Sequence, residues 1–277
     1  MKYGDTKDCP IGVFDSGVGG LTVLRQLQAS LPNESFLYFG DTANVPYGGR
    51  SPENLVALNR QILDWMSRCP VKMAVIACNT SSAWALEQLR HDYPFPILGI
   101  ILPVARAASS LGERIGVIAT QGTVSSDCYR RAIHEIDSTI DVVQMACPEF
   151  VPLIEQGKLE GVEVQRAIEE RLRPLIEAKI DALIYGCTHY PHLELAIRRS
   201  MPSEIQLVDP ALYIAKAVQQ ELRLFRLHAD AASKQHTAFF VSGAPDDFAK
   251  LTRQLMNFSP RVQKITLAQP ETVPIVT

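Results

Sequence analysis

The chain has 277 residues, of which 47% are hydrophobic and 21% are charged, and its formal net charge is -3. This composition is typical of a globular protein that buries one large core or two modest ones. The slight negative charge and the lack of a Lys/Arg block exclude nucleic acid and anionic membranes as expected partners. We therefore expect a small-molecule ligand.

Short apolar strands alternate with helical patterns along the chain. After the polar residues 1–8 we predict, in chain order, a strand at 11–14, a helix at 21–31, a strand at 35–39, a helix at 53–68, a strand at 73–77, a helix at 81–91, strands at 97–101 and 115–119, a helix at 125–136, a strand at 140–146, a helix at 162–178, strands at 182–185 and 206–208, a helix at 211–227 and a strand at 238–241. Such a sequence predicts an α/β protein whose mainly parallel sheets are flanked by helices.

Residues 1–8 lack the apolar stretch of a signal peptide, and no apolar run reaches membrane-spanning length. The six cysteines are scattered through the chain without a secretory signal. We therefore expect a cytoplasmic protein with reduced thiols.

Two segments resemble each other, residues 74–80 and residues 183–189. Each begins with an apolar strand pattern and ends in a turn that carries a cysteine followed by polar residues. A second pair, residues 11–13 and 115–117, repeats the tripeptide Ile-Gly-Val at a similar distance upstream. This similarity predicts two related halves, and a pseudo-twofold axis between them would place one thiol on each wall of an interdomain cleft.

The predicted division follows from this repeat. We place the first α/β domain at residues 1–97 and 210–277, where it carries Cys78, and the second at residues 98–209, where it carries Cys187. Ligands of open α/β sheets bind at the carboxyl ends of the strands, so we expect the active site between the domains.

Cys78 and Cys187 are the candidate reactive groups. We expect both at helix amino termini, where unpaired N–H groups and the helix dipole favour a thiolate. Two opposed thiols suit a reaction in which a proton leaves one face of a carbon and returns on the other face. Asp15 could orient an ammonium group, and His189 could tune its neighbouring thiol. The loop at residues 17–20 is neither a dinucleotide fingerprint nor a Walker A loop.

Several blocks together resemble the bacterial glutamate racemases of the aspartate/glutamate racemase superfamily. They appear in the order of that family at residues 15–20, 40–42, 46–48, 77–80, 150–155 and 186–191. The resemblance implies a cofactor-independent enzyme without a metal that interconverts L- and D-glutamate and supplies D-glutamate for peptidoglycan and cell-wall biogenesis. In that family the cysteine matching Cys78 is the base for D-glutamate, and the one matching Cys187 is the base for L-glutamate.

The resemblance also implies roles for other residues. Asp15 and His189 would assist the cysteines, and Asp41 and Glu155 are auxiliary candidates. The implied substrate contacts are Asp15, Ser16, Tyr47, Gly48, Asn79, Thr80, Thr120, Thr123, Thr188 and His189. We further expect a homodimer.

Three other functions stay open on the sequence. The substrate could be aspartate or another acid, because only one methylene separates aspartate from glutamate. A hydrolase or decarboxylase would use a single cysteine and leave the second unexplained. Cys78, Cys187 and His189 could bind zinc, although no closely spaced ligand pair accompanies them.

Overall fold

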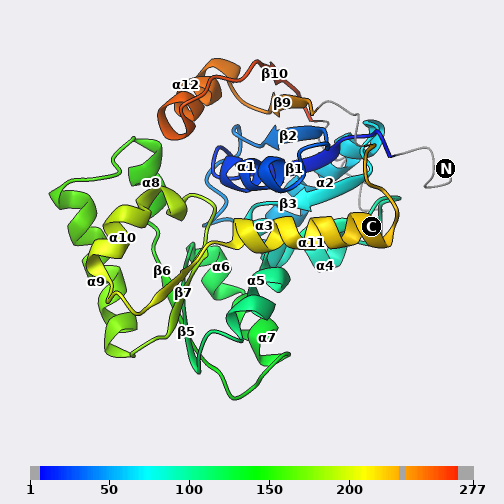
Figure 1. The fold of residues 1–277 in the computed structure, drawn as a ribbon. Coiled ribbons are helices and arrows are strands. Elements are labelled where there is room, and N and C mark those ends of the chain that lie inside the picture. The colour runs from blue at the N-terminus through cyan, green and yellow to red at the C-terminus, as the bar shows by residue number, and fades with distance from the viewer. Residues whose placement is uncertain (1–6, 231–234, 268–277) are drawn as a thin grey trace, which may run out of the picture.

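The computed structural model describes residues 7–230 and 235–267. It contains two parallel β-sheets, each flanked by helices (Figure 1). The predicted α/β class is thereby confirmed. Among the described helices, none combines the length and apolar character needed to span a bilayer.

The larger sheet has the strand order β10-β9-β2-β1-β3-β4, and all neighbouring strands are parallel. Its strands are β1 (Ile11–Asp15), β2 (Phe36–Gly40), β3 (Met73–Ile76), β4 (Ile97–Gly99), β9 (Thr237–Val241) and β10 (Val262–Lys264). The smaller sheet, also parallel, has the order β6-β5-β7-β8. Its strands are β5 (Arg114–Ala119), β6 (Asp141–Ala146), β7 (Ala182–Gly186) and β8 (Gln206–Val208).

The two sheets repeat one topology. The order β2-β1-β3-β4 recurs as β6-β5-β7-β8, so each strand of the first half has a counterpart in the second. The registers match as well, because Ile11 of β1 pairs with Met73 of β3 and Ile115 of β5 pairs with Ala182 of β7. Both Ile-Gly-Val triplets thus lie on equivalent central strands. The predicted two-half architecture is confirmed, and β9 and β10 extend the first half only.

The helices agree with the predicted ones where the amphipathic pattern is long. They are α1 (Leu21–Ser30), α2 (Pro52–Arg68), α3 (Asn79–Trp84), α4 (Leu86–Leu89), α5 (Ile101–Ala108), α6 (Gln121–Ser125), α7 (Cys128–His134), α8 (Phe150–Glu155), α9 (Val162–Glu177), the 3-10 helix η2 (Tyr190–Leu193), α10 (Glu194–Ser200), α11 (Pro210–Leu224) and α12 (Pro245–Met256). The single helix predicted at 81–91 is instead two short helices that meet at Ala85. The sequence interpretation missed α5, α6, α8, η2, α10, α12 and β10.

Local signals explain where the well-predicted helices begin. The Ser51 hydroxyl accepts the Asn54 N–H ahead of α2, and the Asp209 carboxylate accepts the Ala211 N–H ahead of α11. Each helix then starts with a proline, whose missing N–H is not needed at that position.

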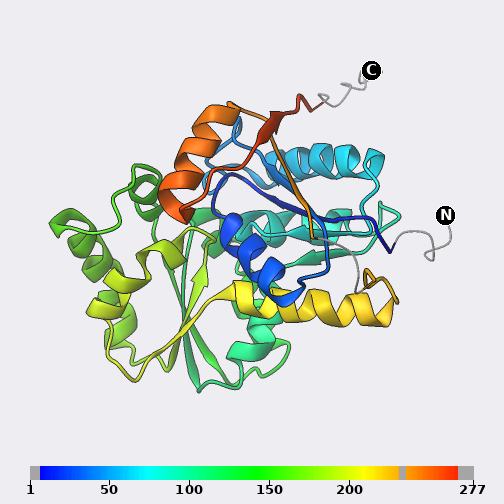
Figure 2. The same ribbon diagram turned by 45° about the horizontal axis from the view of Figure 1, so that its top comes forward.

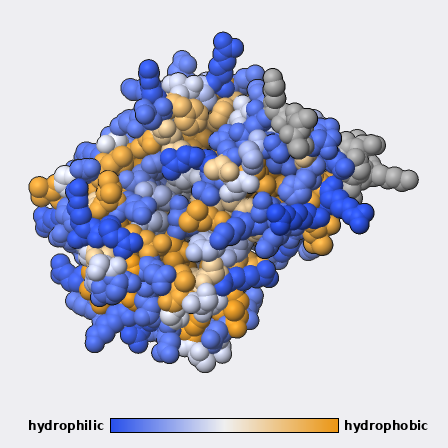
Figure 3. Space-filling model, viewed as in Figure 1, coloured by the Kyte–Doolittle hydropathy of each residue, from blue (hydrophilic) through white to orange (hydrophobic). Residues whose placement is uncertain are grey.

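One hydrophobic core joins the two halves. Helix α11 contacts α1, α5, β4 and β7, and so touches a strand of each sheet. Buried side chains of β1, β5 and α11, such as Val13, Val117 and Ile214, belong to the same cluster. Figure 2 shows α11 starting between the halves and running beneath the larger sheet. The outer surface in Figure 3 is largely hydrophilic, with scattered apolar patches.

Candidate active site

Cys78 follows β3 and forms the amino-terminal cap of α3. Its sulfur accepts the backbone N–H of Ser81 at 3.5 Å. Burial and the nearby negative charge of Asp15 raise the pKa of the Cys78 thiol to about 12, against the opposing effect of the Ser81 hydrogen bond. Cys78 is therefore a neutral thiol in the free site, which is the form that can deliver a proton.

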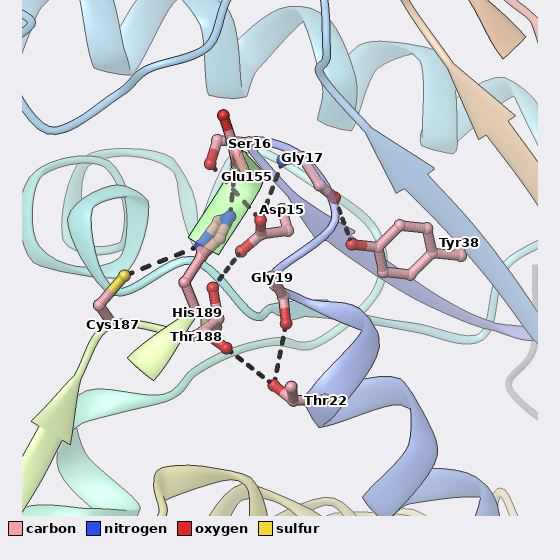
Figure 4. Close-up of polar contacts among 10 residues, drawn as sticks. All are labelled: Asp15, Ser16, Gly17, Gly19, Thr22, Tyr38, Glu155, Cys187, Thr188 and His189. Atoms are coloured by element: carbon pink, nitrogen blue, oxygen red, sulfur yellow. Dashed lines mark hydrogen bonds and ion pairs between the residues drawn. The ribbon is translucent and has the colours of Figure 1, made fainter. Parts of the chain in front are cut away.

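Cys187 follows β7, the strand equivalent to β3. The chain then makes a turn, closed by the Tyr190 N–H on the Cys187 carbonyl, before η2 begins at Tyr190. The prediction of a helix amino terminus is thus confirmed for Cys78 and wrong for Cys187. The turn occupies Thr188 and His189, and it directs these side chains toward Asp15 and Glu155 (Figure 4).

A chain of contacts links the Cys187 thiol to a carboxylate. The Cys187 sulfur lies 3.9 Å from His189 Nδ1, and His189 Nε2 lies 3.3 Å from an oxygen of Glu155 (Figure 4). Burial by itself disfavours the imidazolium, but the contacts with Cys187 and Glu155 outweigh it and raise the pKa of His189 to about 10. A protonated His189 places beside Cys187 the positive charge that stabilises a thiolate.

Asp15 connects the two halves at the end of β1. Its carboxylate accepts the Gly17 N–H at 2.9 Å, and from the other half it accepts the Thr188 hydroxyl at 3.2 Å. The Thr22 hydroxyl adds a second link by donating to the Thr188 carbonyl at 3.2 Å. The loop between β1 and α1 is therefore docked on the turn that carries His189.

Both thiols line one cavity of about 540 Å³. Cys78 reaches it from the larger sheet and Cys187 from the smaller sheet, each at the carboxyl end of its strand. The predicted site in the cleft between the two halves thus coincides with this cavity. A small amino acid fits such a volume with room to spare.

Comparison with known proteins shows the family of this chain. The model of the Asp/Glu/Hydantoin racemase family matches residues 11–218, which extend from β1 into α11 and contain both cysteines. The chain belongs to this family. Among curated relatives, a glutamate racemase from Gloeothece citriformis is 53% identical over 93% of this chain and 92% of that protein. One from Synechocystis is 54% identical over the same shares of the two chains.

Solved structures agree with this assignment. A glutamate racemase isoform from Bacillus anthracis superposes with a TM-score of 0.90 at 34% identity, covering 94% of this chain and 98% of that one. The glutamate racemase from Francisella tularensis, solved in complex with D-glutamate, has a TM-score of 0.88 at 33% identity and the same coverage. The two-domain α/β fold is common to these members of the racemase family.

Most residues predicted for a racemase site lie around the cavity. Those that line it are Ser16, Tyr47, Gly48, Cys78, Asn79, Thr80, Thr120, Glu155, Cys187, Thr188 and His189. Asp15, Asp41 and Thr123 do not line it, and each instead holds a side chain that does.

Three threonine hydroxyls form a triangle across the two halves. Thr80 Oγ1 lies 2.9 Å from Thr120 Oγ1 and 3.1 Å from Thr123 Oγ1, and the last two are 3.1 Å apart. Thr80 belongs to α3, whereas Thr120 caps α6 and Thr123 lies within it. Thr123 therefore does not border the cavity but holds the hydroxyls of Thr80 and Thr120, which do.

Asp41 also lies behind the cavity wall, where it holds Tyr47, which borders the cavity. The Tyr47 hydroxyl donates to one Asp41 oxygen at 2.5 Å, and Ser242 at the end of β9 donates to the other at 2.6 Å. The Gly122 N–H also donates to the Gly48 carbonyl at 2.7 Å, which ties this loop to α6 in the other half.

The sequence interpretation missed part of the cavity wall. The additional lining residues are Val45, Pro46, Gly49, Gln121, Cys147, Pro148, Val151, Pro152, Gln156 and Gly186. Cys147 is fully buried, yet it also borders the cavity. Its place directly after a predicted strand, at the edge where ligands bind, was the available signal.

The structure also bears on the zinc alternative. Within residues 7–230 and 235–267, no three His, Cys, Asp or Glu side chains gather in a way that could hold a metal ion. All six cysteines lie in these ranges and are free thiols.

Proposed function

We propose that this chain racemises glutamate by two-base proton transfer between Cys78 and Cys187. The observation that carries the proposal is that two thiols at equivalent strand ends border one cavity. Its substrate follows from the family and from relatives about half identical that are named glutamate racemases. The reaction needs no cofactor, because both proton transfers use side chains of the chain itself.

Cys187 and Cys78 have different roles in each direction of the reaction. In the direction from L- to D-glutamate, the Cys187 thiolate removes the α-proton, and the Cys78 thiol delivers a proton to the opposite face of the carbon. His189, whose pKa is raised to about 10, places a positive charge beside Cys187, while the raised pKa of Cys78 keeps the proton on that thiol. The D-enantiomer reacts by the reverse path, in which Cys78 is the base.

The remaining residues bind the substrate and the carbanion. The Asn79 carboxamide and the Thr80 hydroxyl supply donors for the carboxylates of the substrate. Thr188, whose hydroxyl hydrogen is donated to Asp15, lies beside them. The other contacts are Ser16, Tyr47, Gly48, Thr120 and His189, and Thr123 supports Thr80 and Thr120. Asp15 orients Thr188, and its negative charge helps to raise the pKa of Cys78. Glu155 orients His189. Exclusion of water from the cleft strengthens each of these interactions.

The proposal also covers the domain division, the cellular location and the oligomeric state. Residues 1–97 with 210–277 form the first domain, and residues 98–209 form the second. Strands β1 to β3, β9 and β10 fall in the first and β5 to β8 in the second, whereas β4 begins at the boundary and extends to Gly99. We place the protein in the cytoplasm as a homodimer that supplies D-glutamate for peptidoglycan.

Incubation of each glutamate enantiomer in D₂O tests the proposal. Optical rotation follows racemisation, and mass spectrometry of the separated enantiomers follows deuterium at the α-carbon. With two distinct bases, deuterium enters the product enantiomer first. Early deuterium in recovered substrate, or faster turnover of aspartate in a competition assay, would contradict the proposal.

A further inference from the structure

The carboxamide of Asn79 is held by a tyrosine from the other half of the molecule. The Tyr129 hydroxyl on α7 donates to Asn79 Oδ1 at 2.6 Å. Tyr129 is fully buried and Asn79 is 2% exposed, so water does not compete for this bond. Burial, followed by the negative charge of nearby groups, raises the pKa of Tyr129 well above its ordinary value, which keeps the hydroxyl as a donor.

The other end of the same carboxamide is free. Among the described residues, Asn79 Nδ2 has no hydrogen-bond partner, although the atom is buried. A buried N–H without a partner is costly, so such groups usually meet a ligand or an ordered water. Asn79 borders the cavity next to Cys78, where a carboxylate of the substrate would accept a hydrogen bond from Nδ2.

The orientation of a carboxamide depends on its partners. A rotation of 180° about the last bond exchanges the oxygen and the nitrogen while leaving the shape unchanged. With the oxygen toward a carboxylate, Asn79 would repel the substrate rather than bind it. A phenolic hydroxyl can accept as well as donate, but among the described residues the Tyr129 hydrogen has no acceptor other than Asn79 Oδ1. The flipped carboxamide would leave this buried hydrogen without a partner, so Tyr129 favours the orientation with the oxygen toward itself.

We propose that Tyr129 is a positioning residue that fixes the Asn79 carboxamide with its NH₂ group free for a carboxylate of the substrate. The inference rests on the proposed glutamate racemisation. It also makes a donor of the first half depend on the second, because Tyr129 lies on α7, which packs against α5 and α6.

The test is Tyr129→Phe, which removes only the hydroxyl. We expect KM for both glutamate enantiomers to rise about tenfold, because one oriented hydrogen bond to the substrate is weakened. We expect kcat to stay within about threefold, because the proton-transfer groups are untouched. The matched control is Tyr185→Phe on β7, whose buried hydroxyl has no partner among the described residues, and KM should not change.

A double-mutant cycle with Asn79→Ala separates positioning from general structural damage. In the Asn79→Ala background, adding Tyr129→Phe should change KM by less than about twofold, because the residue through which Tyr129 acts is gone. An equal rise in both backgrounds, or no rise in either, would overturn the proposal. Melting temperatures of all variants identify any that fail to fold.

Asn79→Asp provides a test that leaves Tyr129 intact. The new carboxylate still accepts the tyrosine hydroxyl but turns its second oxygen toward the substrate, so KM should rise by more than about 100-fold. Normal binding by this variant would contradict the proposal. Wild-type protein is assayed first: absence of racemisation there refutes the proposed function, whereas an unchanged KM in Tyr129→Phe refutes only the positioning role.

Discussion

Replacement of Gly19 by alanine should lower the kcat/KM for glutamate by about 100-fold. A Cβ atom at this position would lie 2.4 Å from His189 Nδ1 and 2.4 Å from Thr188 Oγ1. The backbone of Gly19 does not need glycine, because its φ is not positive. The effect of the substitution is therefore steric and falls on the two residues that follow Cys187.

The size of the effect follows from the overlap. Non-bonded heavy atoms pack at about 3.5 Å, so His189 and Thr188 must move by about 1 Å to make room. A displacement of about 1 Å in a catalytic group is enough to lower the rate by about 100-fold. Overpacking of this kind also costs about 1–3 kcal/mol of stability.

Steady-state racemisation followed by circular dichroism, together with thermal melting, measures both effects. The matched control is Gly17→Ala in the same loop, where the new Cβ would meet only Val45 Cγ1 at 3.3 Å. A side-chain methyl can yield at that distance, so this variant should stay close to wild type. If Gly19→Ala keeps its kcat/KM within about threefold, close packing of this loop on His189 does not set the geometry of the Cys187 side.

Three further predictions concern charge and protonation. Cys78→Ser and Cys187→Ser should each fold normally, as judged by circular dichroism, and each should lose nearly all racemisation; full turnover by either variant would refute the two-base scheme. Because the pKa of His189 is raised from its ordinary value to about 10, its contribution to the free energy of unfolding is present below about pH 6.5 and is lost as the pH rises toward 10. Urea titrations at about pH 7 and about pH 9 should therefore show a smaller pH dependence in His189→Gln than in wild type, and equal slopes would contradict this assignment. Lys72 and Glu34 form a buried ion pair, so Lys72→Met should cost about 3–5 kcal/mol in urea denaturation and the added change Glu34→Gln should restore much of it. A double variant as unstable as the single one would show that the unpaired charge is not the cause.

The strands could be predicted closely because their signal is local. The prediction at 73–77 corresponds to β3 at Met73–Ile76, and the one at 206–208 coincides with β8. The segment after β4 was harder. Apolar residues from Ile97 onward fit a buried strand or a buried helix equally well, and the chain changes from one to the other at Ile100.

The C-terminal helix α12 was missed for a different reason. It has a proline start and two acidic residues in its first turn, which are ordinary helix signals. Phe248, Leu251, Leu255 and Met256 also recur at helical spacing and pack against the core. The signal for this helix was therefore present in the sequence, and the prediction stopped short of it at residue 241.

The thiols could be predicted from the sequence, whereas their partners could not be located by the same reasoning. Cys78 and Cys187 stand in a visible repeat, and a repeat implies equivalent places in the fold. The bond between Asp15 and Thr188 joins residues 173 positions apart, and it depends on how the two sheets pack. The family resemblance implies a role for Asp15 and Thr188 but not the contact between them. Neither the residue patterns nor the resemblance pointed to Tyr129.

The shared core beneath α11 limits how the two halves can separate. Side chains from both sheets belong to one buried hydrophobic cluster, so separating the halves would expose this apolar surface to solvent. Neither half should therefore survive as an independently expressed fragment.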